Sequence, residues 1–140
     1  DCVVCAAAVS DWRPLQVEKR KIKKSNKKTP QLALTKTPDI LSWVGYHKLR
    51  PRLVIGFAAE TENLKINATN KRKNKNADWI LANSVFQSGV SVFNSDNNEV
   101  FFVSKNNMEE WGTNSKETVA QKLTDKISEY FSDNQEKEVV

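Results

Sequence analysis

The residues best suited to chemistry in this sequence are lysines, and they gather in two places. Between Lys19 and Lys28, seven of ten residues are basic. Such a run forms either a solvated loop or a contact surface for phosphate, nucleotide or another polyanion. It contains no aromatic side chain that could stack on bases, which argues against a nucleic-acid-binding module. We therefore expect a solvated flap or a phosphate contact here, and no nucleic-acid partner.

The second group is the pair Lys71 and Lys75, four residues apart in a segment predicted to be helical. Residues at this spacing share one face of a helix, where two like charges cost a few tenths of a kcal/mol. An anion bound between the two ammonium groups would reverse that cost. The neighbouring Arg72 and Lys73 are expected to face solvent.

Redox or metal chemistry is only weakly indicated. Cys2 and Cys5 form a CxxC pair, but the chain has no second cysteine pair and His47 is its only histidine. The surrounding valines and alanines are typical of a strand buried on both faces, so we interpret the cysteines as ordinary thiols in a reducing compartment. With no apolar run of about 18 residues and no signal-peptide pattern, the expected location is cytoplasmic and away from membranes.

The elements that must position these residues alternate between apolar strands and helices. Buried strands are predicted at 2–9, 53–59 and 79–82, with a short half-buried strand at 31–35. Ligands of parallel sheets bind beyond the carboxyl ends of the strands. The polar residues at those ends, which we expect to converge on one ligand edge, are Ser10-Asp11, Glu60 and Asn83.

Three helices are predicted. Thr37 can cap the first helix, with Pro38 at its first position and Asp39 at its positive end. The second is predicted to run from Glu60-Thr61 to Lys75, and the last from Asn114 or Ser115 to Phe131. Residues 91–93 and 100–103 are predicted to form a hairpin around a polar turn at 94–98. The pattern predicts the α/β class: a three-layer Rossmann-like domain with a mainly parallel sheet, ending in a β-hairpin and a helix.

Three segments together resemble a known family: residues 6–14 (AAAVSDWRP) with KIKK at 21–24, residues 37–41 (TPDIL), and residues 56–61 (GFAAET) leading to Lys71 and Lys75. In this order and spacing they are similar to the phosphopantothenoylcysteine synthetase domain of the bifunctional DNA/pantothenate metabolism flavoprotein. The resemblance implies the carboxy-terminal portion of that domain over residues 1–131, with a flap at about 12–30. Residues 132–140 are expected to be a disordered tail.

The resemblance implies a phosphopantothenate–cysteine ligase that uses CTP and Mg²⁺. In that reaction 4′-phosphopantothenate becomes an acyl-cytidylate with release of pyrophosphate, and cysteine then displaces CMP to form an amide. Lys21 matches the catalytic lysine of the family, carried on a flap that reaches the partner's site in a homodimer. No FMN is expected, because the flavin-dependent decarboxylase domain has no counterpart in this sequence.

The same resemblance implies which residues contact CTP. Asp11 is expected to act on the metal through water, with no direct metal ligand, although it could instead cap the turn before Trp12. Phe57 could be a core residue by pattern alone. The full set of implied CTP contacts is Cys5, Ala6, Ala7, Asp11, Pro38, Asp39, Ile40, Leu41, Phe57, Lys71 and Lys75.

The family's domain begins with a glycine-rich strand–turn–helix and an asparagine-bearing segment, and this sequence shows neither. We therefore expect the chain to be the CTP and flap side of the enzyme and to be inactive alone. The alternative is a non-catalytic subunit of the same family that binds nucleotide or dimerises. The choice of CTP over ATP rests wholly on the resemblance.

Overall fold

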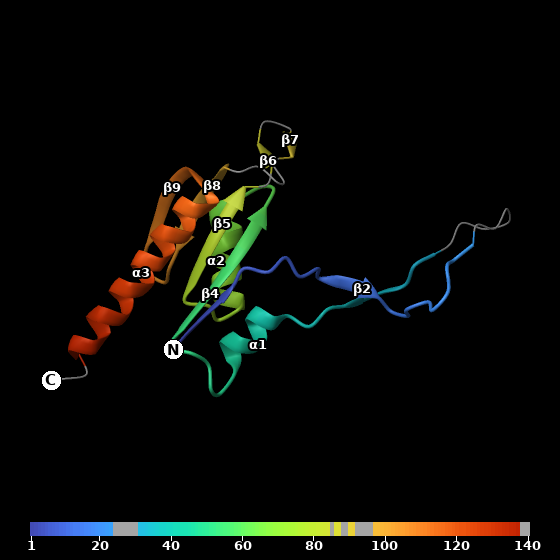
Figure 1. Cartoon of the computed structure of the whole chain (residues 1–140), viewed down its shortest axis with the longest axis horizontal. Helices are drawn as coiled ribbons and strands as arrows, with labels where there is room; N and C mark the ends of the chain where they lie inside the picture. The colour runs from blue at the N-terminus through green and yellow to red at the C-terminus, as the bar shows by residue number, and fades with distance from the viewer. Residues whose placement is uncertain (24–30, 85, 88–89, 92–96, 138–140) are drawn as a thin grey trace.

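A five-stranded sheet forms the middle layer of the molecule (Figure 1). The computed structural model describes residues 1–23, 31–84, 86–87, 90–91 and 97–137. In spatial order the strands are β1 (Cys2–Cys5), β4 (Leu53–Glu60), β5 (Trp79–Ser84), β8 (Asn97–Val103) and β9 (Met108–Ser115). The first three are parallel to one another, and β8 and β9 run antiparallel to their neighbours.

Helices cover both faces of this sheet. Helices α1 (Ile40–Tyr46) and α2 (Leu64–Asn74) pack on one face, where Val54, Ala58 and Ile80 form the core. Helix α3 (Lys116–Lys137) packs on the other face. The predicted three-layer α/β class, with its carboxy-terminal hairpin and helix, is confirmed.

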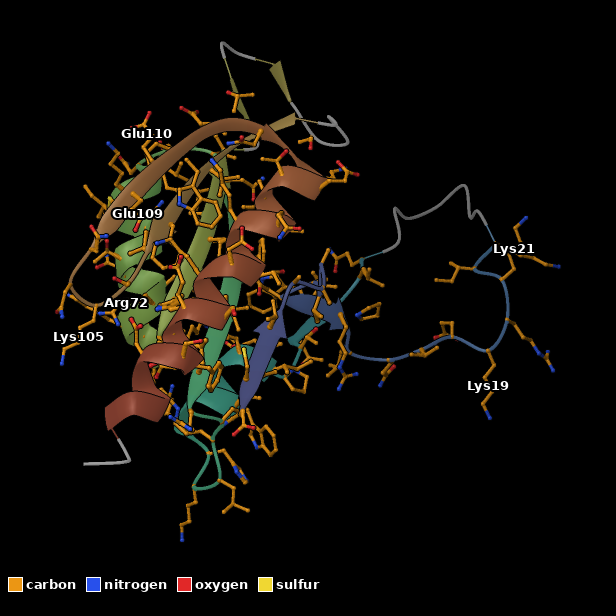
Figure 2. All side chains as sticks on the ribbon, turned by 60° about the vertical axis from the view of Figure 1, so that its left-hand side comes forward. Lys19, Lys21, Arg72, Lys105, Glu109 and Glu110 are labelled. Carbon is orange, nitrogen blue, oxygen red and sulfur yellow. The ribbon has the colours of Figure 1, made fainter. Side chains whose placement is uncertain are left out.

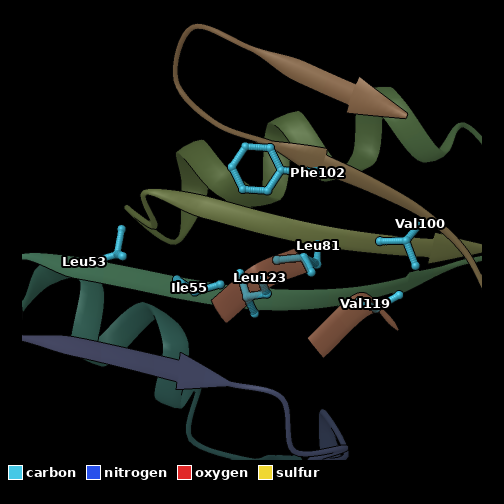
Figure 3. Close-up of a cluster of buried hydrophobic side chains, with 7 residues drawn as sticks. All are labelled: Leu53, Ile55, Leu81, Val100, Phe102, Val119 and Leu123. Atoms are coloured by element: carbon cyan, nitrogen blue, oxygen red, sulfur yellow. The ribbon is translucent and has the colours of Figure 1, made fainter. Parts of the chain in front are cut away.

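The core beneath α3 combines aliphatic and aromatic side chains (Figure 3). Leu53, Ile55 and Leu81 have no exposed surface, because β4 and β5 are covered on both faces. Phe102 of β8 stacks on Trp111 of β9, with ring centroids 5.6 Å apart. Burying aromatic rings of this size makes a large contribution to stability, so the hairpin is anchored firmly to the sheet.

Strand β1 differs from the prediction. It ends at Cys5, and residues 6–9, expected to continue it, lie outside the sheet and are exposed. Val4 is 43% exposed, so the prediction that this strand is buried on both faces was wrong. The physical reason is that β1 lies at the edge of the sheet. Within the described part of the chain, β4 is its only partner strand.

A two-stranded arm extends sideways from the sheet (Figure 1). Its base is the antiparallel pair β2 (Trp12–Pro14) and β3 (Leu34–Lys36). We call the described residues 12–23 and 31–36 the arm; the rest of the predicted flap, residues 24–30, lies outside the described residues. The predicted strand at 31–35 is therefore displaced toward Lys36, and its partner strand was not predicted.

Two helices begin later than predicted. The N-cap of α1 is Asp39, whose Oδ1 accepts a 2.9 Å hydrogen bond from the backbone N–H of Ser42. Thr37 lies between the arm and the helix, where its backbone N–H donates to the carbonyl of Asp11, and it does not cap. Helix α2 begins at Leu64 because β4 continues to Glu60, which pairs with Ser84 of β5. Strand pairing thus outweighed the helix-start pattern at residues 60–61.

The partner strand predicted for residues 100–103 was wrong. Strand β8 pairs with β9, through a turn at residues 104–107, where the backbone N–H of Ser104 donates to the carbonyl of Asn107 at 2.8 Å. Val90–Ser91, near the expected partner strand, instead forms β7 and pairs with β6 (Phe86–Gln87). Asn97 and Asn98, expected in the turn, belong to β8. Residues 92–96, which include most of the expected partner strand and the rest of the turn, lie outside the described residues.

Helix α3 begins after Ser115, whose Oγ accepts a hydrogen bond from the backbone N–H of Thr118 at 3.2 Å. It continues to Lys137, so residues 132–137 are helical and not the predicted disordered tail; residues 138–140 lie outside the described residues. No described helix has both the length and the apolar character that crossing a membrane requires.

Candidate functional site

A cleft of about 670 Å³ lies beyond the carboxyl end of β1, where the arm joins the sheet. Its walls come from residues after β1, the base of the arm, the start of α1, Phe57 of β4, and α2. All eleven residues predicted to contact CTP line this one cleft. The other lining residues are Val4, Val9, Ser10, Trp12, Lys36 and Thr37. The structure thus brings the predicted set together, while its contacts with a nucleotide stay a prediction.

The wall after β1 is built from small side chains. The chain turns out of the sheet after Cys5, and the backbone N–H of Val9 donates to the carbonyl of Ala7 at 2.9 Å. Ala6 and Ala7 add only methyl groups, which leaves room for a ligand to approach the backbone. Burial raises the pKa of the Cys5 thiol, so this side chain stays protonated near neutral pH and is a poor nucleophile.

The base of the arm is tied to the start of α1 by backbone hydrogen bonds. The N–H of Thr37 donates to the carbonyl of Asp11 at 2.9 Å. The turn into Trp12 is held by Ser10, whose Oγ donates to the Trp12 carbonyl at 2.9 Å. Ser10 therefore performs the turn-capping role that Asp11 was considered for. The Asp11 carboxylate is exposed at the cleft.

Two glycines let α1 sit close enough to complete the cleft. A Cβ on Gly56 of β4 would lie 2.4 Å from Cδ2 of Leu41, which packs directly over this strand. A Cβ on Gly45 would lie 2.0 Å from the carbonyl oxygen of Lys75. Here the Asn76 side chain donates to the Gly45 carbonyl at 2.7 Å. The helix is therefore locked against both the sheet and the end of α2.

Lys75 is held by a carboxylate inside the cleft. Its Nζ donates to Oδ2 of Asp39, while Oδ1 of the same carboxylate caps α1 through Ser42. Burial raises the pKa of Asp39, but hydrogen bonds from Lys75 and Ser42 and the charges of Lys75 and Lys71 outweigh it. The net pKa lies below its ordinary value, so Asp39 is ionised at neutral pH.

Lys71 is held by a carboxylate that does not line the cleft. Its Nζ lies 3.4 Å from Oε1 of Glu60, the last residue of β4. One turn further along α2, Lys75 faces the same cleft, as its spacing from Lys71 predicts. The two lysines therefore differ in where their negative partners lie.

Lys36 is a cleft residue that the sequence reasoning missed. It ends β3 and lines the cleft together with Lys71 and Lys75. Its position directly before the Thr37-Pro38-Asp39 motif was the one sequence feature that could have indicated this role. Its orientation toward the cleft depends on the pairing of β3 with β2, which was not predicted. The three lysines give the cleft cations from both the arm and α2, facing the carboxylates of Asp11 and Asp39.

Lys21 lies far from the cleft of its own chain. Figure 2 shows Lys19 and Lys21 on the outer part of the arm, well separated from the sheet. Lys21 is exposed and does not line the cleft. Within the described part of the chain, Lys21 therefore has no neighbouring side chain from the sheet.

The expected convergence of three strand ends on one site was only partly right. The carboxyl ends of β1, β4 and β5 lie at the same edge because these strands are parallel. Glu60 and Asn83, however, belong to the ends of β4 and β5, and Asp11 comes six residues after the end of β1. Only Asp11 lines the cleft described above. Asn83 lines a separate, mainly apolar cleft of about 420 Å³ between the sheet and α3. The two clefts adjoin one another, because Val4, Ala6 and Phe57 line both.

A protein-only metal site is not found among the described residues, where no cluster of three or more His, Cys, Asp or Glu side chains could hold an ion. The exposed Asp11 carboxylate fits a looser role, because Mg²⁺ keeps several waters and binds through one or two carboxylates and substrate phosphates. The donor set in the cleft is therefore compatible with a metal that arrives with a phosphate ligand.

The fold and the cleft together define an α/β-layered protein with a cationic cleft beyond the end of a parallel edge strand. The sequence profile of the DNA/pantothenate metabolism flavoprotein C-terminal domain matches residues 1–131. The chain therefore belongs to this family, as its sequence resemblance indicated.

Curated and solved relatives agree with this family. The chain is 41% identical over 125 residues to the coenzyme A biosynthesis bifunctional protein CoaBC of Haemophilus influenzae, covering 89% of this chain and 30% of that protein. The CoaBC protein of Borreliella burgdorferi is 36% identical over 124 residues, covering 88% and 30%. The chain thus spans about a third of the length of these relatives.

Among solved structures, the chain is similar to the C-terminal domain of a CoaBC protein, with a TM-score of 0.69 and 32% identity. The match covers 95% of this chain and 56% of that domain. The likeness supports the α/β fold with a mostly parallel, mixed sheet described above.

Proposed function

We propose that this chain binds CTP in the cleft beyond β1 and forms the nucleotide and flap side of a phosphopantothenate–cysteine ligase in coenzyme A biosynthesis. The observation that carries the proposal is the gathering of all eleven expected CTP contacts around one cleft of about 670 Å³. These residues come from four separate stretches of sequence. Their meeting at one point is a property of the fold, and the family resemblance supplies the ligand.

The charges of the cleft suit a triphosphate. Lys36, Lys71 and Lys75 surround the space, and Lys75 already has a carboxylate partner that a phosphate oxygen would replace. Charge-assisted hydrogen bonds from ammonium groups to phosphate are stronger than neutral ones. The alanine wall after Cys5 allows the nucleoside to lie against the backbone, with Leu41 and Phe57 as its apolar neighbours.

The proposed reaction has two steps. The carboxylate of 4′-phosphopantothenate attacks the α-phosphorus of CTP, which breaks the α–β phosphoanhydride bond and releases pyrophosphate. The amine of cysteine then attacks the acyl carbon and CMP leaves with the bonding electrons, while the amine proton passes to solvent. Mg²⁺, when bound with the nucleotide, would neutralise phosphate charge, with Asp11 holding it through water.

The role of this chain in both steps is electrostatic. Lys71 and Lys75 hold the phosphates, so that the α-phosphorus faces the attacking carboxylate. We place Lys21 over the cleft of a partner subunit, because the arm carries it away from its own cleft. A flap of this kind would also exclude water from the acyl-cytidylate intermediate.

A homodimer is part of the proposal and is supported by the surface of the arm. Leu15, Leu32 and Leu34 are 56%, 63% and 51% exposed, although they are large and apolar. A backbone hydrogen bond of 2.8 Å joins Leu15 to Ala33, which lies between the other two leucines, and large exposed apolar patches mark interaction sites. A second copy that covers these residues would bring each Lys21 near the other subunit's cleft.

The test is the thermal unfolding of the chain with Mg²⁺ and either CTP or ATP. We expect CTP at 100 times its Kd to stabilise the fold by about 2.7 kcal/mol, and ATP to do much less. Lys75→Gln should remove most of the CTP effect, while Lys73→Gln, an exposed neighbour on the same helix, should leave it unchanged. Equal protection by the two nucleotides would contradict the proposed CTP site.

A further inference from the structure

We propose that Glu60 is a positioning residue for nucleotide binding. Glu60 lies outside the cleft and holds the Lys71 ammonium group in place at the border of the cleft. The inference rests on the proposed CTP site and adds to it a residue for which the resemblance implies no role. Glu60 ends β4, and its side chain is 19% exposed, against 33% for Lys71. A carboxylate this well covered needs a positive or hydrogen-bonding partner.

Glu60 has partners on both of its oxygens, and both come from α2. Lys71 Nζ contacts Oε1 at 3.4 Å, and the side-chain amide of Asn67 donates to Oε2 at 3.3 Å. The same amide donates to the carbonyl of Glu62 at 2.9 Å. Asn67 therefore ties the glutamate to the loop before α2, and the carboxylate is fixed before any ligand arrives.

Helical spacing places Asn67, Lys71 and Lys75 in one row, each four residues from the next. Along this row Asn67 contacts Glu60, Lys71 contacts Glu60, and Lys75 contacts Asp39. Asp39 lines the cleft, so an incoming phosphate competes with it directly for Lys75. Glu60 does not line the cleft, so Lys71 can keep this partner and still offer its remaining N–H donors to a phosphate.

Removal of the Glu60 charge has two opposing effects. It leaves Lys71 free to move, and fixing a flexible lysine on binding costs side-chain entropy. It also removes a negative charge that repels the phosphates from behind the ammonium, an interaction weakened by the solvent near this edge. We expect the loss of positioning to be the larger effect while Lys71 is present. Only the relief of repulsion remains once Lys71 is gone.

The experiment is a double-mutant cycle on the 140-residue chain, with the Kd for CTP measured by calorimetry in Mg²⁺. Glu60→Gln should weaken binding about fivefold in the wild-type background. In a Lys71→Gln background the same change should leave the affinity unchanged or raise it slightly. Glu62→Gln, an exposed glutamate two residues away, is the matched control and should not alter affinity in either background.

Unchanged or tighter CTP binding by Glu60→Gln in the wild-type background would overturn the inference, as would equal weakening with and without Lys71. If Glu60→Gln does not fold, Asn67→Ala takes its place in the cycle, with the same sign expected and a smaller change. Failure of the wild-type chain to bind CTP would overturn the proposed function together with this inference. Normal wild-type binding without coupling would overturn the inference alone.

Discussion

The sheet and the arm of this molecule differ in the burial of their apolar side chains. In the sheet, Leu53, Ile55 and Leu81 are completely buried between two helical layers. In the arm, Val17 is 84% exposed and Leu32 63%. The sheet is thus stabilised by contacts within the chain, whereas the arm leaves large apolar side chains exposed. The cleft lies where these two regions meet.

This difference bears on how the proposed activity is divided. The lysines that belong to packed elements, Lys71 and Lys75, have carboxylate partners already in place. Lys21 stands on the outer part of the arm, away from the sheet (Figure 2). We infer that the sheet provides a preorganised binding site, and that the arm brings its lysine to a site completed by another subunit.

The largest expected effect comes from Lys21→Gln in a full-length protein that carries this sequence. Loss of a positioned cation from the reacting centre should lower kcat at least about 100-fold. The affinity of the isolated chain for CTP should stay the same, because Lys21 does not line the cleft. Pyrophosphate release measures the activity, and Lys19→Gln on the same arm is the matched control. Unchanged turnover in Lys21→Gln would refute the catalytic role.

The same variant tests whether the arm acts across subunits. Lys21→Gln subunits mixed with Lys75→Gln subunits should recover roughly a quarter of the wild-type activity, since half of the dimers are mixed and one of their two sites is intact. Without recovery after subunit exchange, Lys21 would have to act on its own chain.

A smaller effect is expected within the sheet-bound region, where α1 meets α2. Gly45→Ala should lower the free energy of unfolding by about 2 kcal/mol or more, since the added Cβ would meet backbone at 2.0 Å. Gly112→Ala is the control: its φ of +72° strains an alanine, but no atom lies within 4 Å of the new Cβ. It should cost only about 1 kcal/mol. Urea unfolding compares the two, and equal losses would show that α1 is not locked by this contact.

The smallest effect concerns the pH dependence of stability at Asp39. Its pKa is lower in the folded chain than in the unfolded chain, so the ionised pair stabilises the fold at and above the unfolded pKa. That contribution disappears as pH falls through the lower, folded pKa. Because the side chain is 44% exposed, solvent screening limits it to a few tenths of a kcal/mol.

Unfolding at pH 7 and pH 3 measures this effect. The stability difference between wild type and Asp39→Asn should shrink at the lower pH. A difference that stays constant between the two would show that the Asp39 charge contributes nothing to stability beyond its helix cap.

The sequence predicted the parts of the fold that local pattern controls. The apolar runs at 53–59 and 79–82 became the central strands β4 and β5, because such runs can be satisfied only by burial on both faces. Strand β9 went unpredicted, since Glu109, Glu110 and Gly112 interrupt its apolar pattern. Its place in the sheet depends on other elements: β9 pairs with β8, and Glu109 accepts a hydrogen bond from Lys126 of α3 at 2.8 Å.

For the candidate site, the sequence predicted which residues meet but not how they are held. The predicted CTP contacts came from the resemblance, and the fold gathers all eleven of them around one cleft, whereas Lys21 lies outside it. Lys36 and Glu60 needed the structure. The orientation of Lys36 depends on the β2–β3 pairing, and the contact of Glu60 with Lys71 depends on where β4 stops and α2 starts.

The two oxygens of the Asp39 carboxylate make its hydrogen bonding sensitive to ligand binding in the cleft. One oxygen accepts a hydrogen bond from the backbone N–H of Ser42, and the other accepts a hydrogen bond from Lys75. A ligand that draws Lys75 away therefore changes the charge distribution of the carboxylate and strengthens or weakens its hydrogen bond to the Ser42 N–H. The chemical shift and hydrogen-exchange rate of a single backbone N–H would then follow occupancy of the site. Binding could be titrated by NMR on uniformly labelled protein, without a labelled nucleotide.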